Sequence, residues 1–455
     1  MSGYSEYVAD FLLETVPLIN RIGECSAEVA MELYDMLETV ARSSSENIRT
    51  IDTSIRVEVC NRLDLVLEHI VDIMPLQAGG QADVYTPAVQ GYRRWQNVEL
   101  MKDKGLAGYT LAKELGASAY MLFCTKPEDY PYLAELPGLH LLYSDSESGL
   151  ADVYYEHLSK NYNKMDILVL HGMYNETALY LNEYRKLRPD GKVFCGLDMN
   201  SYWMGNTTWN NPVVQRFAAQ CDLIATSCKP LRDALNRNRL VSFPCRYFPN
   251  GFYNPTDTEI VAEPGVKENT IITVGKIGTA PKNNPELMVA FAKASKALKK
   301  WKLKLIGSIE PEFFAFIDKY FGEHPDLRER VIFTGAIVDK AELYSEYAKA
   351  KVFALTSTSE GAPNVYAEAL FHGCKFITSD IDAADDITNS GELGIKYKRG
   401  DVEGLTKALV KLCSDADAGA FEKHIPKALD YAAKYFDWKR NAKKLAYALL
   451  KPGQG

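Results

Sequence analysis

The spacing of hydrophobic residues divides the chain into a helical beginning and a longer part in which strands and helices alternate. Residues 1–74 place apolar side chains at helical spacing, for instance Val29, Leu33 and Leu37, and contain almost no glycine. This pattern predicts two or three amphipathic helices, interrupted at Ser43–Ser45, that pack as a small bundle. Two roles stay open for the bundle: a cap on the next domain, or a module for dimerisation or acceptor docking.

After the predicted bundle, the sequence first becomes loop-like and then alternates between strand and helix patterns. Pro75–Gly91 is rich in Gly, Pro and Gln and reads as a linker or loop. After it, short and fully apolar runs alternate with helical stretches, which is typical of a parallel sheet covered on both faces. The expected strands are residues 119–123, 139–142, 167–170, 193–195 and 223–226, and helices are expected at 177–187 and 230–236.

A dense turn, Pro249–Pro255, followed by polar residues to Asn269, is the best candidate for a connection between two domains. A second alternating series then begins. Two doubly wound units in tandem form a cleft that the carboxyl ends of their strands face. The sequence therefore predicts an α/β protein of two Rossmann-like domains. In the second, strands are expected at 271–274, 303–306, 331–333, 352–355 and 376–378, and helices near 285–300, 311–321, 339–350, 363–372 and 401–413.

Composition narrows the class of protein. A chain of 455 residues is too long for a single hydrophobic core and suggests two or three domains. Its content of 47% hydrophobic and 25% charged residues is ordinary for a soluble globular protein. A net charge of −8 argues against nucleic acid as a partner. No apolar run reaches the roughly 18 residues of a membrane span. The first residues lack the form of a secretory signal, so we expect a cytoplasmic protein; a peripheral membrane contact stays open.

The cysteines agree with this expectation. The chain has nine, none in a CxxC pair, and several lie in apolar runs, such as Cys124 and Cys195. We expect reduced, buried thiols rather than a disulfide framework or a zinc site, and no metal centre.

The segment Ser357–Gly373 carries the first candidate chemistry. Pro363 suits the first turn of a helix and Gly373 the position just past its end. A helix start offers unpaired amides and a positive dipole end, where a diphosphate can bind. Glu360 and Glu368 would lie roughly 12 Å apart along such a helix, so one could accept hydrogen bonds from sugar hydroxyls and the other from ribose hydroxyls. Two ordinary surface glutamates explain the same spacing.

A second candidate segment, Ile271–Pro285, follows an expected strand. Lys276 and Lys282 flank a loop rich in Gly and Pro that leads into a helix. Two ammonium groups at the carboxyl end of a strand can bind a diphosphate and stabilise its negative charge as it leaves. Two solvated loop lysines are the plainer alternative.

Together the two segments resemble the retaining, metal-independent GT-B glycosyltransferases of family 4. In that family a strand ending in Val-Gly-Arg is followed by a Lys, and two glutamates flank a downstream segment. This chain has Lys276 in place of the Arg, with Lys282, Glu360 and Glu368 at the matching positions and Ala362 in place of the usual aromatic residue. Further segments agree in order: Cys221–Ser227, Phe248–Gly251, Phe333–Ile337 and Phe436–Trp438.

The resemblance implies a role for each matched residue. Lys276 and Lys282 would bind the donor pyrophosphate and, with Glu360, serve catalysis. Glu368 would bind the ribose hydroxyls, and Ile337 would contact the edge of the base. The donor sugar and phosphate would lie against Glu360 and the backbone of Gly361, Ala362, Pro363, Asn364 and Val365.

The resemblance also implies the reaction and the domain limits. The expected enzyme is a hexosyltransferase that acts with retention and without a metal or resident cofactor. Its co-substrate would be a nucleotide sugar, for which we expect a UDP-sugar, although the residues leave uridine, guanosine and adenosine open. The acceptor would be a glycan, a lipid-linked compound or a protein. The expected division is a helical extension (1–74), an acceptor-side domain (75–255), a donor-nucleotide domain (256–435) and a last helix crossing back (436–455).

One departure from the family concerns the first domain. The family places a His near the reacting carbon, where this chain offers Asp198 as a catalytic candidate. His171 is an alternative. Residues 96–100 would take the place of the family's first strand, and Gly105 would belong to the glycine-rich loop after it. Tyr202, Trp203 and Trp209 follow Asp198 and could stack on a sugar or simply pack within their loop.

Two other functions compete with transfer. A non-catalytic partner or chaperone subunit would keep the fold and bind acceptor only. A nucleotide-sugar epimerase would use the same architecture but would need acid and base groups around the sugar, which Glu360 and Glu368 fit less well. Residues 1–74 separately suggest a homo-oligomer or a partner protein.

Overall fold

The computed structural model describes residues 3–47, 50–76, 82–87, 97–123, 130–143, 150–255, 262–419 and 421–450. The chain divides into two compact units. Unit 1 comprises Met1–Pro249 with Trp438–Gly455, and unit 2 comprises Asn250–Asp437. The four-part division expected from the sequence, with limits at residues 74, 255 and 435, stays a prediction.

Unit 1 is built on a parallel sheet that has seven strands within the described residues, in the order β3-β2-β1-β4-β5-β6-β7. Val84 of β1 pairs with Ala119 of β2 on one side and Ile167 of β4 on the other. β1 and the first four residues of β4 are buried, as expected for strands covered on both faces. The strands are β1 (Val84–Pro87), β2 (Ala119–Phe123), β3 (Leu139–Tyr143), β4 (Ile167–His171), β5 (Lys192–Gly196), β6 (Leu223–Thr226) and β7 (Cys245–Tyr247).

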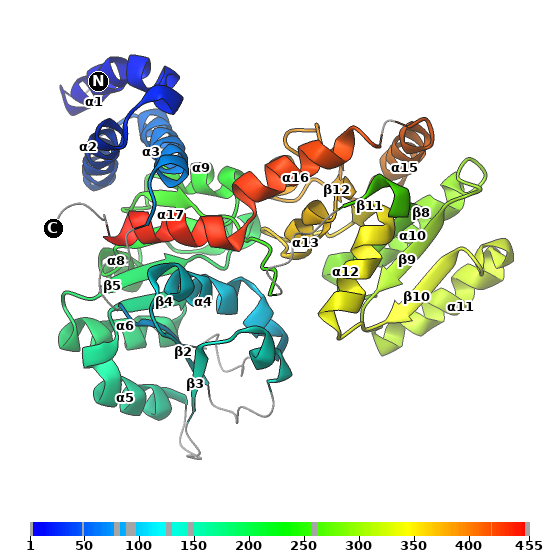
Figure 1. Ribbon diagram of the computed structural model, residues 1–455, viewed down its shortest axis with the longest axis horizontal. Helices are drawn as coiled ribbons and strands as arrows, with labels where there is room; N and C mark the ends of the chain where they lie inside the picture. The colour runs from blue at the N-terminus through cyan, green and yellow to red at the C-terminus, as the bar shows by residue number, and fades with distance from the viewer. Residues whose placement is uncertain are drawn as a thin grey trace. The chain divides into compact units, whose positions relative to one another are not determined.

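Helices cover this sheet. α4 packs on β1 and β2, α9 packs on β6 and β7, and α17, the red helix of Figure 1, packs on α4. The helices of unit 1 that follow β1 are α4 (Asp103–Leu115), α5 (Leu150–Asn161), α6 (Asn175–Leu187), α7 (Ser201–Asn206), α8 (Pro212–Ala219), α9 (Lys229–Arg237) and α17 (Trp438–Leu450), with 3-10 turns η2 (Asn97–Met101), η4 (Pro131–Glu135) and η5 (Tyr162–Lys164).

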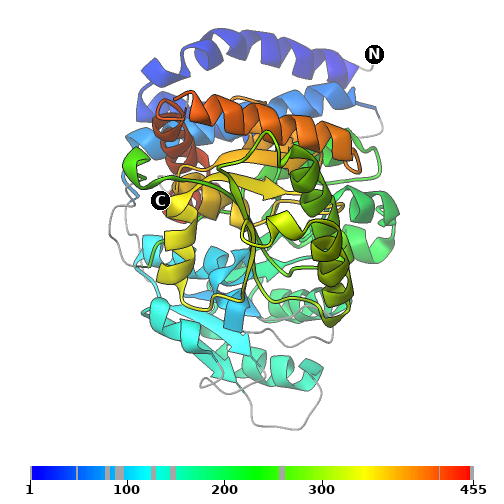
Figure 2. The ribbon, with the colours of Figure 1, turned by 90° about the vertical axis from the view of Figure 1, so that its right-hand side faces the viewer.

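The N-terminal residues form the predicted helical bundle. Its helices are α1 (Gly3–Asn20), α2 (Ala27–Glu46) and α3 (Thr53–Ile73), with the short η1 (Ile22–Glu24) between the first two. α2 and α1 both pack on α3 (Figure 2). The predicted interruption at Ser43–Ser45 is wrong, because these serines lie inside α2. The Ser44 and Ser45 hydroxyls donate to the carbonyl of Ala41, at 2.8 and 2.9 Å, so they bond within the helix instead of ending it.

Buried charges attach α3 to the rest of unit 1. Arg56 is fully buried and donates to the carbonyls of Val241 and Phe243, at 2.8 and 2.5 Å. The Asp64 carboxylate lies 2.7 Å from the guanidinium groups of both Arg232 and Arg246. The helical bundle is therefore packed against the Rossmann-like sheet as a cap.

The predicted start of the first sheet is wrong. The stretch read as a linker contains β1, a central strand of the sheet. Residues 96–100 were expected to take the place of the first strand, but the described part of that segment lies in the 3-10 turn η2. β1 has only four residues and ends at a proline, so it carries too little pattern to stand out between its Gly-rich and polar flanks.

Unit 2 has a second parallel sheet, with six strands among the described residues in the order β10-β9-β8-β11-β12-β13. Ile271 of β8 pairs with Leu303 of β9 and with Val352 of β11. Its five predicted strands are confirmed, and β13 was missed. The strands are β8 (Glu268–Val274), β9 (Lys302–Ile306), β10 (Val331–Gly335), β11 (Ala350–Leu355), β12 (Lys375–Ser379) and β13 (Gly394–Tyr397).

The helices of unit 2 follow the predicted series with one shift that matters later. The predicted helix at 363–372 begins at Val365 and has seven residues. The helices are α10 (Asn284–Ala294), α11 (Phe314–Glu323), α12 (Lys340–Lys349), α13 (Val365–Phe371), α14 (Ala384–Ile387), α15 (Val402–Asp417) and α16 (His424–Tyr435), with 3-10 turns η6 (Pro264–Val266), η7 (Ala280–Lys282), η8 (Pro311–Phe313) and η9 (Pro325–Leu327). Fully buried Leu287 and Phe291 of α10 and Leu409 of α15 belong to the core on this sheet.

Two further expectations concern membranes and thiols. No helix within the described parts of the chain is long and apolar enough to cross a bilayer. No disulfide joins any two of the eight described cysteines; Cys25 and Cys221 are half-buried and the rest are buried. Cys124 lies outside the described residues.

Candidate functional site

Two of the candidate residues of unit 2 meet where the order of its sheet reverses. β8 and β11 are neighbours, but the chain continues from β8 to β9 on one side and from β11 to β12 on the other. Loops that leave the carboxyl ends of two such strands diverge, and the space between them is where open α/β sheets bind ligands. Here the two loops are residues 275–283 and 356–364.

Lys282 and Glu360 lie in these two loops and contact each other. The Lys282 ammonium nitrogen is 2.6 Å from Oε1 of Glu360. Their side chains are 22% and 23% exposed, so the pair is sheltered yet open to solvent. The structure thus brings together two residues that the sequence placed 78 positions apart.

Backbone hydrogen bonds hold the two loops against each other. The amide of Thr358 donates to the carbonyl of Pro281 at 2.8 Å. The buried Thr356 hydroxyl lies 3.0 Å from the carbonyls of both Lys282 and Asn283. The lysine–glutamate pair is therefore positioned by the protein before any ligand binds, which lowers the cost of ordering on binding.

A second set of bonds fixes the loop before α13 in a non-helical path. The Asn250 side-chain amide donates to the carbonyl of Ala362 at 2.9 Å, and the amide of Ala383 donates to the carbonyl of Gly361 at 3.1 Å. The Ser379 hydroxyl donates to the carbonyl of Ser357 at 2.6 Å. Sequence reasoning missed these supporting residues, although the Pro-Asn-Gly turn that contains Asn250 was a visible signal.

The loop after β8 depends on one glycine. Gly278 has φ +91°, and a Cβ there would lie 2.5 Å from Phe313. Its amide donates to the side-chain oxygen of the buried Asn284 at 2.7 Å. This bond closes the loop that carries Lys282 onto the start of α10.

Lys276, the other predicted lysine, is not in the contact between Lys282 and Glu360. Its ammonium group pairs with Glu310, and its side chain is 63% exposed. Glu310 is 24% exposed, so Lys276 holds this pairing from the solvent side.

Glu368 lies in α13 and faces α12. Lys340, at the start of α12, is 3.1 Å from its Oε1, and the Tyr347 hydroxyl donates to its Oε2 at 2.9 Å. Ile337 lies half-buried in the loop just before α12. Neither Lys340 nor Tyr347 was predicted as a site residue, because nothing in local spacing links α12 to α13.

The short helix α13 changes one prediction and confirms another. Asn364 precedes the helix with its side chain making no cap, and Pro363 lies outside the helix. A helix of seven residues offers only a small dipole, so the lysines are the main source of positive charge. Gly373, with φ +68°, lies just past the helix end as predicted.

Unit 1 has a separate cluster at the carboxyl edge of its own sheet. The Tyr174 hydroxyl donates to Asp198 Oδ2 at 3.0 Å. Nε2 of His171, the last residue of β4, is 3.5 Å from both Asp103 and Asp198. Lys104 lies 3.9 Å from Asp198. Both sequence candidates, Asp198 and His171, are therefore in one cluster, next to the reversal of strand order between β1 and β4.

The groups in this cluster stabilise each other's charge. Burial by itself favours neutral His171, but the nearby Asp103 and Asp198 carboxylates outweigh it and raise the pKa of His171 above its ordinary value. Burial also disfavours charge on Asp198, yet the hydrogen bond and charge of His171 and the charge of Lys104 hold the pKa of Asp198 well below its usual range. The carboxylates on either side of the ring therefore favour the protonated form of His171.

The other predicted residues of unit 1 lie outside this cluster, and two of them are packed in the fold. Gly105 lies inside α4, not in a loop, and a Cβ there would come within 2.2 Å of the Leu100 carbonyl oxygen. Trp209 is buried, so it packs within the fold, whereas Tyr202 and Trp203 are 64% and 59% exposed.

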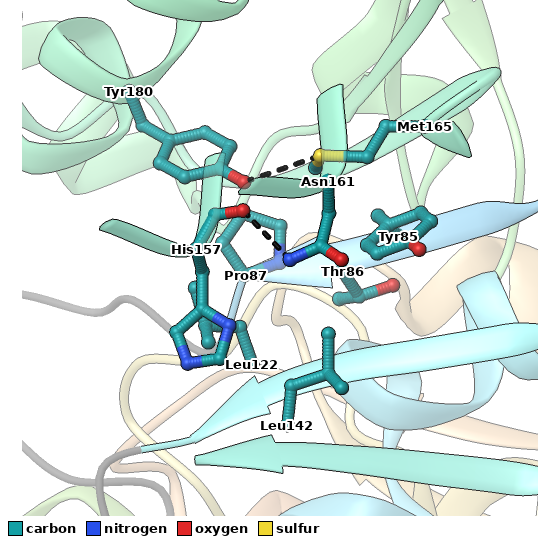
Figure 3. A pocket seen from close by; sticks show the side chains of 9 residues that line it. All are labelled: Tyr85, Thr86, Pro87, Leu122, Leu142, His157, Asn161, Met165 and Tyr180. Carbon is teal, nitrogen blue, oxygen red and sulfur yellow. Dashed lines mark hydrogen bonds between the residues drawn. The ribbon is translucent and has the colours of Figure 1, made fainter. Parts of the chain in front are cut away.

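Two cavities of unit 1 contain none of these candidates. The one between the sheet and α5 and α6 has a volume of about 10 Å³ and holds at most one water (Figure 3). There the Tyr180 hydroxyl points to the sulfur of Met165 at 3.9 Å. A larger one, of about 310 Å³, is lined by residues of α2 and by Asp222 and Phe243. Among the described residues, no group of three or more His, Cys, Asp or Glu side chains is arranged to hold a metal ion.

Two parallel, helix-covered sheets define the GT-B class of fold, that of two-domain glycosyltransferases, and in this chain a helical bundle precedes them. Residues 268–415, which contain Lys276, Lys282, Glu360 and Glu368, match the family model described as "Glycosyl transferases group 1". Among curated proteins, no sequence matches the chain.

Solved structures share the fold at low sequence identity. The galactosyltransferase of the lipopolysaccharide outer core, WaaB, is 14% identical with a TM-score of 0.56 over 81% of this chain and 99% of its own. Sucrose-phosphate synthase from Thermosynechococcus elongatus is 16% identical (TM-score 0.59; 80% and 98%). HepE of Anabaena, solved in complex with UDP, is 15% identical (TM-score 0.59; 80% and 98%). The matched family and the shared fold together support a glycosyltransferase function.

Proposed function

We propose that the protein transfers a hexose with retention from a nucleoside-diphosphate sugar, and that Lys282 and Glu360 form the centre of its donor site. The observation that carries the proposal is their contact at the strand-order reversal of unit 2, inside the segment that matches the glycosyltransferase model. A basic and an acidic side chain at this position suit the two parts of such a donor, its diphosphate and its sugar hydroxyls.

The main electrostatic task in this reaction is to stabilise the leaving diphosphate. As the bond to the sugar breaks, negative charge grows on the phosphate oxygens while the sugar becomes oxocarbenium-like. The Lys282 ammonium would neutralise part of that charge from a fixed position, and Lys276 would leave its exposed pairing with Glu310 to add a second cation. Two lysines fill the role that a metal ion has in other transferases, so we propose that transfer needs no metal.

Glu360 has a different task. A carboxylate directly against phosphate would be repulsive, so its free lone pairs are better used on hydroxyls of the donor sugar. The loop Gly361–Val365 would approach the sugar and phosphate with its backbone. HepE has been solved in complex with UDP-glucose, which supports a UDP-sugar as the first donor to test.

We propose that the cluster of Asp198 and His171 serves the acceptor side. Its carboxylates can accept hydrogen bonds from an acceptor hydroxyl, and Asp198 can stabilise transient positive charge on the sugar. A glycan, a lipid-linked compound or a protein acceptor each offers such a hydroxyl.

The test is turnover of donor with the variants Lys282→Met and Glu360→Gln. Loss of one preorganised group that acts on the transition state costs on the order of 10²–10³ in kcat, and we expect a loss of this size in both variants. Lys293→Met is the matched control, because Lys293 pairs with Glu403 on the surface of the same unit. Chelator should leave the wild-type rate unchanged. Full activity in both site variants would reject the proposed site, and absence of binding to any nucleotide sugar would favour the non-catalytic partner.

A further inference from the structure

We propose that Lys340 and Tyr347 are positioning residues that orient Glu368 to read both ribose hydroxyls of the donor nucleotide. The inference rests on the proposed function, since it concerns the ribose of the same donor. It adds two residues, Lys340 and Tyr347, that neither the motif spacing nor the resemblance pointed to.

The geometry around Glu368 is the first argument. Each carboxylate oxygen has a different donor: Oε1 has the Lys340 ammonium at 3.1 Å, and Oε2 has the Tyr347 hydroxyl at 2.9 Å. Two donors on opposite oxygens fix the rotation of the carboxylate plane. A glutamate alone on a helix surface would rotate about its terminal torsion, which has only broad preferences.

The number of lone pairs is the second argument. A carboxylate can accept about four hydrogen bonds, two on each oxygen. With one bond already made on each side, each oxygen keeps one acceptor position. Two acceptor positions on adjacent oxygens of one plane match the two hydroxyls of a cis diol, and the 2′- and 3′-hydroxyls of a ribose are such a pair.

Packing beneath the carboxylate holds both donors in place. Tyr347 is fully buried and its ring stacks on His372, with centroids 5.7 Å apart. Burial and the Glu368 charge raise the pKa of Tyr347 well above its usual value, so its hydroxyl keeps its proton and donates. The Lys340 ammonium also lies 5.6 Å from the centre of the Tyr344 ring.

The backbone of Glu368 is fixed as well. Nδ1 of His372 is 2.7 Å from the Glu368 carbonyl, and because a carbonyl only accepts, this nitrogen carries the proton. Burial lowers the pKa of His372 to about 4, so its ring is neutral at pH 7. The cation in contact with the Glu368 carboxylate is Lys340. Lys340 itself begins α12, which Asp339 caps by accepting from the amides of Ala341 and Glu342.

The experiment compares the binding of UDP, 2′-deoxy-UDP, 3′-deoxy-UDP and inorganic pyrophosphate by calorimetry. In the wild type, loss of either hydroxyl should weaken binding about tenfold or more, as for hydrogen bonds to a charged group. In Lys340→Met the penalty for removing a hydroxyl should fall below about threefold, while pyrophosphate binding stays unchanged. Lys340→Arg should restore most of the discrimination.

Two further variants separate positioning from folding. Tyr347→Phe keeps the buried ring and removes only the hydroxyl, and it should also weaken discrimination. Lys349→Met, in the last turn of the same helix, is the matched control and should discriminate like the wild type. Equal binding of UDP and both deoxy forms by the wild type, or undiminished discrimination in Lys340→Met, would overturn the inference while the proposed function stands. No binding of UDP, GDP, ADP or pyrophosphate by the wild type would overturn both.

Discussion

The charged side chains at the candidate sites have partners in the protein itself. Glu360 has Lys282, Glu368 has Lys340 and Tyr347, and Asp198 has His171. A charge that is already paired and sheltered keeps its position at little entropic cost when a ligand arrives. Binding then exchanges or adds partners around a fixed group.

The unit 1 cluster makes a prediction about His171. Because its pKa is raised in the folded protein, the stability it contributes is full below about pH 6.5 and is lost as pH rises through the folded pKa. An NMR titration, assigned with His171→Gln, should show a pKa above 6.5. Asp198→Asn removes one of the two carboxylates and should lower that pKa.

Lys104 also lies near the cluster and works against protonation of His171. Lys104→Met should therefore move the pKa of His171 upward, opposite to Asp198→Asn. A pKa of His171 that does not change in either variant would show that these charges do not act on the ring.

At the scale of residues, the sequence predicted which side chains belong to the candidate site, but not which of them contact each other. The offsets between Lys276, Lys282, Glu360 and Glu368 carried the resemblance, so each was predicted by type and position. Lys340 was not, because its contact with Glu368 joins two helices whose facing sides depend on packing. Which of two equivalent lysines meets Glu360 is also a property of loop conformation, not of spacing.

At the scale of elements, loops and helix starts are set by hydrogen bonds from distant residues. The helix start predicted at Pro363 is delayed to Val365, because Asn250 and Ala383 hold the carbonyls of Ala362 and Gly361. Long strands such as β8 and β11 were predicted from their apolar runs. The short strands β1, β7 and β13 were missed, since their three or four residues include polar side chains or proline and form no apolar run, whereas the equally short β6 is such a run and was predicted.

Gly105 gives a test at the element scale. Gly105→Ala would place a Cβ within 2.2 Å of the Leu100 carbonyl oxygen, where backbone cannot yield easily. We expect the free energy of unfolding to fall by about 1–3 kcal/mol, as for other overpacked positions.

Denaturant unfolding measures this change, and Gly205→Ala is the control. Gly205 lies in α7, and a Cβ added there would have nothing within 4 Å, so alanine should leave stability unchanged or raise it by up to about 1 kcal/mol. Equal stability of the two variants would mean that η2 and α4 are not as closely packed as described.

At the scale of the whole molecule, the N-terminal bundle belongs to unit 1. The buried ion network of Asp64, Arg232 and Arg246 joins α3 to the sheet and its helix α9. The sequence predicted the bundle and two Rossmann-like sheets, but it left open what the bundle contacts. Amphipathic spacing shows that one face of a helix is buried, but it does not show which part of the protein covers that face.

The network predicts the effect of Asp64→Ala. The Asp64 carboxylate is the anion that pairs with both buried guanidinium groups, those of Arg232 and Arg246. When it is removed, both lose this ion pair, and we expect the free energy of unfolding to fall by about 3–5 kcal/mol. Thermal and denaturant unfolding would measure it. Glu24→Ala is the control, because Glu24 and Arg21 form an exposed pair and its loss should change stability by less than about 1 kcal/mol.

The most direct test of the donor site is a crystal structure of the full chain grown with UDP. The diphosphate should lie at the carboxyl ends of β8 and β11, with a phosphate oxygen about 2.7–3.2 Å from the Lys282 ammonium and the ribose against Glu368. A diphosphate bound elsewhere on the molecule, with Lys282 and Glu360 still paired only to each other, would show that this pair is not the donor site.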